Sequence, residues 1–380
     1  MVELALALLP VAAATGWYVA YKHYKNRTNA STLDHSKYFQ GLNHLVNEQS
    51  DKAVDVFVNL LEVDNETIEV HLALGTLFRK RGEVEKAIRL HQNLMARPEL
   101  EHDIRLEILN ELGMDYMHAG LLDRAESLFL ELEQYPNHRL NVTKQLLSIY
   151  QQEKEWLSSI DYARKLKSLD STPQHVLLAH LHCELASALA KTRDYKEAKS
   201  NLKQALKYDS LCVRSNFINA KMAISNNKYK VALEYLMAIK QQNINFVPVF
   251  LDMFLLCFDQ LNKQNEKFKF LSAVESEINS DLLTNTFVLA LNKQKGAENA
   301  VAFLKNKLLE SPRLGDLTML SSMLVDENNH SDIKTVSNAL SILYQEHHHF
   351  LCNTCGFDSE KLNWMCPSCK HWGTITPVNS

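Results

Sequence analysis

Four cysteines near the C-terminus combine residue type and spacing in a way that points to metal chemistry. Two C-x-x-C pairs, Cys352 with Cys355 and Cys366 with Cys369, are separated by ten residues. In a reducing compartment this arrangement is typical of a metal site and not of two disulfides. Four thiolates suit a tetrahedral zinc ion or a mononuclear iron ion. Because such a shell leaves no open position for a water ligand, hydrolytic catalysis is not expected.

The segment that holds these cysteines, residues 346–380, is expected to be a small metal-dependent domain. Phe357, Trp364 and Trp372 supply most of its core, and a core of that size needs metal binding as its folding energy. Lys361 and Lys370 balance Asp358 and Glu360, so the domain lacks the positive surface of a nucleic-acid module. We therefore expect no nucleic-acid partner, and we expect the domain to dock on a protein surface, most simply on the repeats that precede it.

These repeats have a period near 34 residues. Three glycines are each followed, twelve residues later, by an alanine and, sixteen residues later, by a ring: Gly41, Gly75 and Gly113 with Phe57, His91 and Phe129. The period and the pattern match the tetratricopeptide repeat, whose unit is a pair of antiparallel helices A and B. The small residues let each helix approach its neighbour closely, and the rings are expected to fill the seam between successive units.

Weaker copies of the pattern continue along the chain, and their alanines include Ala163, Ala198, Ala232 and Ala300. We therefore predict a mostly α-helical superhelix of seven to nine helix pairs over residues 34–345. The composition agrees, because only 10 of 380 residues are glycine, against a usual share of about 7%. This scarcity predicts few backbone positions with positive φ. The other three cysteines, Cys183, Cys212 and Cys257, lie in the repeats and are expected to be small buried apolar groups.

Arrays of this kind bind proteins or peptides along a concave wall lined by the A helices. Under the register above, the expected partner-binding residues are Arg79, Lys80, Asn110, Met114, His118, Lys144 and Gln152. The alternative for each of them is a solvated surface position without a partner. Self-association through the terminal repeats or the N-terminal segment also remains open.

The N-terminal segment predicts a membrane anchor. Residues 2–21 are apolar apart from Glu3, and Lys22, Lys25 and Arg27 follow at once. Twenty helical residues span the hydrocarbon core of a bilayer, and the basic residues place the following chain in the cytoplasm, with the N-terminus outside. A cleaved signal peptide would carry its basic residues before the apolar stretch. A plain amphipathic helix is the other alternative.

The predicted organisation is therefore an anchor at residues 1–21, a basic linker at 22–33, the repeat array at 34–345 and the metal domain at 346–380. The sequence contains no P-loop, zincin, nucleophile-elbow or protein-kinase motif. The formal net charge is −4, which gives no reason to expect binding to nucleic acid. We expect a binding protein and not an enzyme.

This order of parts resembles the lipopolysaccharide assembly protein B family of Gram-negative bacteria, over essentially the whole chain. The strings that carry the resemblance are Leu9-Pro10-Val11-Ala12-Ala13-Ala14, Gly16-Trp17-Tyr18, Asp51-Lys52-Ala53-Val54-Asp55, Arg81-Gly82-Glu83-Val84 and Cys366-Pro367-Ser368-Cys369 with Trp372. The family's metal cysteines correspond to the two C-x-x-C pairs, in a rubredoxin-like domain that implies iron. Lys370 stands where classical rubredoxins have glycine, and the spacer between the pairs is short, so iron and zinc both stay open.

The resemblance also implies a function and a location. It implies a non-enzymatic adaptor in the bacterial inner membrane, single-pass with a periplasmic N-terminus, that regulates lipopolysaccharide synthesis. Such an adaptor promotes degradation of the lipid A committed-step deacetylase by the membrane AAA protease FtsH. A membrane-anchored regulator that senses lipopolysaccharide opposes it. The alternative is a structural scaffold that holds envelope-synthesis enzymes together without affecting proteolysis.

Overall fold

The computed structural model describes residues 15–20, 22, 39–41, 43–44, 50–58, 65–98, 100–170, 172–278, 280–328, 340 and 349–378. The chain divides into two compact units, Met1–Glu153 and Lys154–Ser380. The described residues are mostly helical, and short strands occur in the C-terminal part of the second unit.

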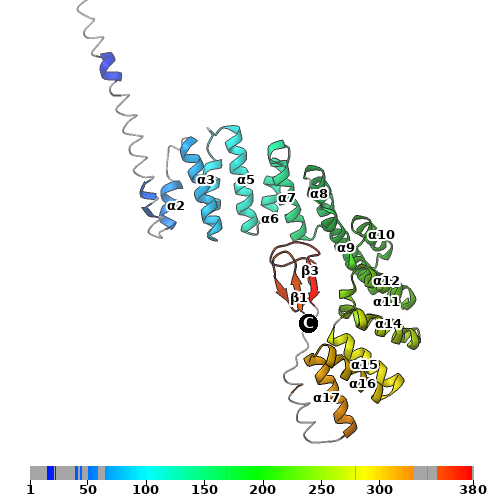
Figure 1. Ribbon diagram of the computed structural model, residues 1–380. Helices are drawn as coiled ribbons and strands as arrows, with labels where there is room; N and C mark the ends of the chain where they lie inside the picture. Colours follow the sequence, from blue (N-terminus) through cyan, green and yellow to red (C-terminus); the bar gives the residue numbers. More distant parts are fainter. Residues whose placement is uncertain are drawn as a thin grey trace, which may run out of the picture. The chain divides into compact units, whose positions relative to one another are not determined.

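The first unit is built from consecutive antiparallel helices, shown from blue through cyan to green-cyan in Figure 1. They are α2 (Ser50–Val58), α3 (Asn65–Lys80), α4 (Val84–Met95), α5 (His102–His118), α6 (Leu122–Glu133) and α7 (Pro136–Glu153). The odd-numbered helices are A helices and the even-numbered ones are B helices.

The second unit continues the alternation and ends in a small sheet (Figure 1). Its first helices are α8 (Trp156–Leu169), α9 (His175–Lys191), α10 (Tyr195–Tyr208), α11 (Val213–Ser225) and α12 (Tyr229–Gln242). Two 3-10 turns, η1 (Ile244–Phe246) and η2 (Pro248–Phe250), then precede α13 (Leu251–Gln260), α14 (Gln264–Glu277), α15 (Asp281–Lys295), α16 (Ala297–Glu310) and α17 (Leu314–Asn328). Within the described residues of each unit, A and B helices pack in pairs: α3 with α4 and α5 with α6 in the first unit, and α9 with α10, α11 with α12, α13 with α14 and α15 with α16 in the second. This confirms the predicted mostly α-helical repeat fold.

The close approach of the A and B helices explains the three repeat glycines. A Cβ atom at Gly41 would lie 2.7 Å from Cζ of Phe57, and one at Gly113 would lie 2.8 Å from Cε1 of Phe129. His91 occupies the equivalent place against Gly75. Each ring therefore packs directly on the backbone of the preceding helix, and any side chain on the glycine would expel it.

The turns between A and B helices correct the expectation that positive φ would be rare. Gly82 and Gly120 have φ of +83° and +73°, and Arg193, Asn227 and Asn262 have φ of 66°, 57° and 55° in the corresponding turns of later repeats. In each turn the residue that follows the positive-φ position donates its backbone N–H to the carbonyl five residues before it. Glu83 donates to Phe78 in this way, and Asp194 donates to Leu189. This is the Schellman ending of a helix, which favours glycine but accepts asparagine and, at a cost, other residues.

The predicted anchor and linker, residues 1–21 and 22–33, lie mostly outside the described residues. Residues 15–20 are helical, and Trp17 and Tyr18 are exposed there. Among the residues that the structure describes, no helix is both long and apolar enough to cross a membrane.

Candidate metal centre and its seat on the repeats

The C-terminal domain consists of two matching loops on a three-stranded antiparallel sheet, which we call the ribbon (residues 349–378). Strand β1 (His349–Cys352) lies between β2 (Asp358–Ser359) and β3 (Ile375–Val378). The first loop begins at the end of β1, where Cys352 pairs with Ile375 of β3. The sheet thereby fixes the position of the first cysteine pair.

The two loops have the same backbone hydrogen bonds. In the first, the N–H of Gly356 donates to the carbonyl of Cys352, and the N–H of Cys352 donates to the carbonyl of Phe357. In the second, Lys370 donates to Cys366, and Cys366 donates to His371. Gly356 and Lys370 both have positive φ, +73° and 60°. Lys370 therefore adopts the conformation of the glycine that it replaces, and the departure from the rubredoxin pattern leaves the loop intact.

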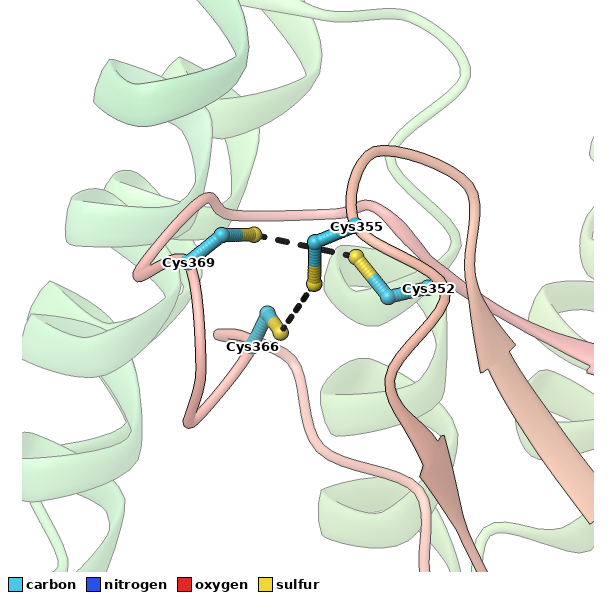
Figure 2. Close-up of side chains that lie close together, drawn as sticks. All are labelled: Cys352, Cys355, Cys366 and Cys369. Atoms are coloured by element: carbon cyan, nitrogen blue, oxygen red, sulfur yellow. Dashed lines mark hydrogen bonds between the residues drawn. The ribbon is translucent and has the colours of Figure 1, made fainter.

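The four thiols converge on one point between the loops (Figure 2). The Sγ atoms of Cys352 and Cys369 are 3.8 Å apart, those of Cys355 and Cys366 are 3.7 Å apart, and all four lie within 4.8 Å of one another. A disulfide would need about 2.0 Å. Four thiolates at about 2.3 Å from a tetrahedral ion are separated by about 3.8 Å. The thiols therefore fit a metal ion, with a geometry that zinc and iron share.

The electrostatics of the thiols also favours a cation. A hydrogen bond from the Thr374 hydroxyl, helped by backbone N–H groups, lowers the pKa of Cys352 to about 6. The backbone N–H of His371 stabilises the Cys369 thiolate, but burial and the neighbouring thiols outweigh it and raise the pKa of Cys369 to about 12. Four thiols this close cannot all ionise unless a positive ion compensates the charge.

Two tryptophans that flank the second loop seat the ribbon on the repeats of the same unit. Trp372 stacks on His180 of α9, with ring centroids 5.5 Å apart, and Trp364 stacks on Phe246 of η1 at 6.1 Å. The guanidinium carbon of Arg214, in α11, lies 5.7 Å from the Trp364 ring and 5.8 Å from the Trp372 ring. This confirms the expectation that the ribbon docks on the repeats.

The contact surface between the ribbon and the repeats, which we call the seat, is buried and closely packed. His180 and Arg214 are buried, and burial followed by the nearby Arg214 charge lowers the pKa of His180 to about 3. The imidazole is therefore neutral, so it can pack against the indole ring without the cost of a buried charge. Gly373 approaches so closely that a Cβ atom there would lie 2.8 Å from Nε2 of His180.

The sequence did not predict which residues of the repeats contact the ribbon. His180, Arg214 and Phe246 occupy repeat positions that carry no motif. The two 3-10 turns of η1 and η2 also interrupt the helical periodicity that would have located Phe246. The expectation that Trp364 and Trp372 form the ribbon's own core is wrong, because that core is Phe350, Cys352, Cys366 and Ile375 and the two indoles pack on the repeats. Two large aromatic side chains in so short a domain were the available signal for such a contact.

The predicted partner-binding residues all lie on A helices of the first unit, namely Arg79 and Lys80 on α3, Asn110, Met114 and His118 on α5, and Lys144 and Gln152 on α7. Lys80, His118, Lys144 and Gln152 are exposed, and Asn110 and Met114 are half-buried.

Arg79 differs from the others because it is buried. It donates to Glu111 at 2.6 Å and to Asp115 at 2.7 Å, and Asp115 contacts Nδ1 of His91 at 2.5 Å. Although burial opposes ionisation of Glu111, Arg79 holds the pKa of that carboxyl below its usual range. The Arg79 guanidinium therefore links helices of neighbouring repeats and is not exposed on the concave surface that was expected to bind a partner.

A hollow of about 450 Å³ opens beside Asn110, between the beginning of α5 and the beginning of α7. Its lining includes Asp103 and Glu107 of α5 and Tyr135 before α7. Both carboxylates are exposed. The hollow gives the first unit a concave polar surface of the size that receives a side chain of a partner.

The full length of the chain matches curated relatives. It is 36% identical over 386 residues to lipopolysaccharide assembly protein B of Escherichia coli (strain K12), a match that covers 100% of this chain and 98% of that protein. The chain belongs to the lipopolysaccharide assembly protein B family. The protein of that name from Haemophilus influenzae is 31% identical over 393 residues, with 100% of this chain and 99% of that protein covered.

The parts of the chain match as well. Residues 350–377 match the family described as the rubredoxin metal binding domain, and residues 70–102 and 183–244 match tetratricopeptide repeat families. Among solved structures, a tetratricopeptide repeat protein from Parabacteroides merdae is 14% identical and covers 73% of this chain and 100% of its own, with a TM-score of 0.35. A likeness that low adds nothing to the fold assignment.

Proposed function

We propose that this protein is a non-enzymatic adaptor of the bacterial inner membrane that acts in lipopolysaccharide assembly. In this proposal it promotes FtsH-dependent proteolysis of the lipid A committed-step deacetylase, and a membrane-anchored lipopolysaccharide-sensing regulator opposes it. The observation that carries the proposal is the full-length match to lipopolysaccharide assembly protein B. The protease, the deacetylase and the regulator come from the family resemblance.

The metal centre supports a structural and not a catalytic role. Cys352, Cys355, Cys366 and Cys369 would hold the ion, and four thiolate ligands would leave no coordination position for a substrate. The residues around it bind and orient protein groups: Thr374 holds the Cys352 thiolate, and the flanking tryptophans hold the repeats. The ribbon therefore acts as a fixed part of the binding surface in the second unit.

The first unit supplies a separate surface for a protein partner. Its A helices display Lys80, His118 and Gln152, and the hollow beside Asn110 is lined by carboxylates and an aromatic ring. These groups can bind side chains and backbone of a polypeptide by hydrogen bonds and ion pairs. An N-terminal anchor would hold this surface near a membrane protease and its substrate, where an effective concentration of about millimolar lets modest contacts suffice.

The deciding experiment measures the half-life of the deacetylase in cells depleted of this protein and complemented with variants. Wild type is expected to restore rapid turnover, and Glu107→Lys, in the hollow, is expected to restore it only in part. Glu131→Lys is the matched control, because Glu131 is exposed on the B helix α6 of the same unit and does not line the hollow.

The outcomes separate the two functions under consideration. An unchanged deacetylase half-life after depletion, with lipopolysaccharide assembly impaired, would reject the adaptor and support the scaffold. Equal loss in the two lysine variants would reject the hollow as a partner site. Deletion of residues 1–21 tests the anchor: full regulation by the soluble fragment at equal abundance would reject the role of tethering.

A further inference from the structure

Two cysteines outside the metal centre face each other inside the second unit. Cys183 lies in α9 and Cys212 immediately precedes α11, and their Sγ atoms are 3.8 Å apart. Both are buried. The sequence predicts a small buried apolar group at each of these positions, and the fold also brings the two thiols together although they are 29 residues apart.

The two thiols have different acidities. The two thiols share a hydrogen bond, which raises the pKa of the Cys183 thiol and lowers the pKa of the Cys212 thiol. Cys212 also precedes the first turn of α11, where the positive end of the helix dipole favours a thiolate. The pair therefore contains one candidate nucleophile and one protonated neighbour.

Cys257 provides an internal comparison. It is buried in α13, and burial raises its pKa to about 11. None of the described thiol contacts involves it. It is thus a buried thiol of the same protein without a partner thiol.

Access to Cys212 requires only a local opening of the chain. The turn between α10 and α11 contains Ser210 and Leu211, which are exposed, and Leu211 has 65% of its surface in solvent. The turn is closed by the bond from the N–H of Cys212 to the carbonyl of Asp209 at 3.2 Å and by one from the N–H of Leu211 to the Asp209 side chain at 3.0 Å. The side chain of Gln242 also donates to the carbonyl of Ser210 at 2.7 Å. Exposed turns held by few bonds open far more often than the whole fold.

We propose that Cys183 and Cys212 form a peroxide-responsive dithiol that closes to a disulfide. The Cys212 thiolate attacks one oxygen of hydrogen peroxide, the O–O bond breaks, and protonation of the leaving hydroxide gives water and a sulfenic acid. The sulfur of Cys183 then attacks the sulfenic sulfur, and the S–O bond breaks as the S–S bond forms and a second water leaves. In sum, two thiols lose two electrons and two protons, and one hydrogen peroxide becomes two waters.

The disulfide would act on the seat of the ribbon. The same two elements are joined by the ion pair of Arg214 with Glu184, at 2.8 Å, and Arg214 lies over both ribbon tryptophans. Closing the sulfurs from 3.8 Å to about 2.0 Å draws the start of α11 toward α9. Oxidation is therefore expected to change the environment of the tryptophans.

The test uses full-length, metal-loaded protein treated with hydrogen peroxide, followed by alkylation of free thiols and peptide mapping. We expect a disulfide-linked peptide pair containing Cys183 and Cys212, formed at least about tenfold faster than Cys257 is oxidised. Tryptophan fluorescence should change with the same rate constant. In Cys183→Ser, Cys212 should stop at a sulfenic acid that a dimedone probe captures, and Cys257→Ser should behave as wild type.

Three results would overturn the proposal. The first is that Cys183 and Cys212 stay as alkylatable as Cys257. The second is that Cys212 gives no sulfenic acid in Cys183→Ser, when circular dichroism shows that this variant retains its helices. The third, formation of the disulfide without a change in tryptophan fluorescence, would reject its action on the ribbon seat.

Discussion

Replacing Gly373 by alanine is expected to weaken the docking of the ribbon on the repeats without touching the metal ligands. A Cβ atom at this position would lie 2.8 Å from Nε2 of His180 and 3.2 Å from Cγ1 of Val176. His180 is buried under Trp372 and has little room to move aside. The added methyl group must therefore push the ribbon and α9 apart.

Two effects add to the free-energy cost of Gly373→Ala, and the same substitution at a second glycine, Gly356, separates them. Gly373 and Gly356 both have positive φ, +66° and +73°, and alanine in that conformation costs about 1–2 kcal/mol at either site. That cost falls on the folded ribbon, docked or undocked. Nothing lies within 4 Å of a Cβ atom at Gly356. Only Gly373→Ala therefore adds the overpacking cost of about 1–3 kcal/mol, which weakens docking by about 5- to 150-fold.

Hydrogen exchange on purified, metal-loaded protein measures this difference. Both variants should keep the metal and lose a similar amount of ribbon stability. Gly373→Ala alone should increase exchange in the segments that the ribbon covers, 175–191 and 244–250, and should change the tryptophan emission. Equal exchange in those segments for the two variants would refute the described seat.

Four further outcomes test other parts of the structure. Lys370→Gly should stabilise the metal-loaded ribbon against chelator by about 1 kcal/mol, because it removes a side chain at positive φ; faster metal loss would contradict this. Arg193→Gly should raise the melting temperature for the same reason, and a lower one would argue against the Schellman turn. Cys352→Ser should abolish stoichiometric metal binding while circular dichroism stays helical. Since Arg79 lowers the pKa of Glu111, the urea midpoint of the first unit should fall as the pH drops below about 4.5, and less so in Glu111→Gln.

The chemistry of the chain could be predicted because it depends on local patterns. The metal cysteines lie in two short loops, so their spacing already brings the thiols together. The repeat glycines and their rings are sixteen residues apart, and one helical hairpin is enough to explain their contact. His91 fits the same rule although it is not the usual phenylalanine, since the site needs a flat ring against the backbone of Gly75.

The turns could not be predicted from the glycine count, and the reason is energetic. Positive φ destabilises the folded state by only about 1–2 kcal/mol at a residue with a Cβ atom. The packing of the two helices on either side of the turn outweighs that cost. Arg193, Asn227 and Asn262 therefore occupy turns that Gly82 and Gly120 occupy in earlier repeats. Glycine is scarce in this chain because its repeats tolerate the strain, and not because its turns avoid positive φ.

Local sequence patterns do not predict contacts between distant parts of the chain. The contact between the ribbon and the repeats is the main example. Its array side uses His180, Arg214 and Phe246, which are 34 and 32 residues apart along the sequence. Each is unremarkable in its own repeat. They acquire a role only because α9, α11 and η1 present them to the same indole rings.

The metal centre and the contact with the repeats depend on the same loop of the ribbon. Trp364 and Trp372 bracket Cys366 and Cys369, and the N–H of Gly373 donates to the carbonyl of Trp364 at 2.8 Å. The spacing of the two tryptophans is therefore set by the loop whose thiols hold the ion. Because Arg214 lies near both rings, it can make both contacts only while that loop keeps its shape. We therefore expect that metal binding preserves the packing of both tryptophans on the repeats, because it holds the loop between them in one conformation.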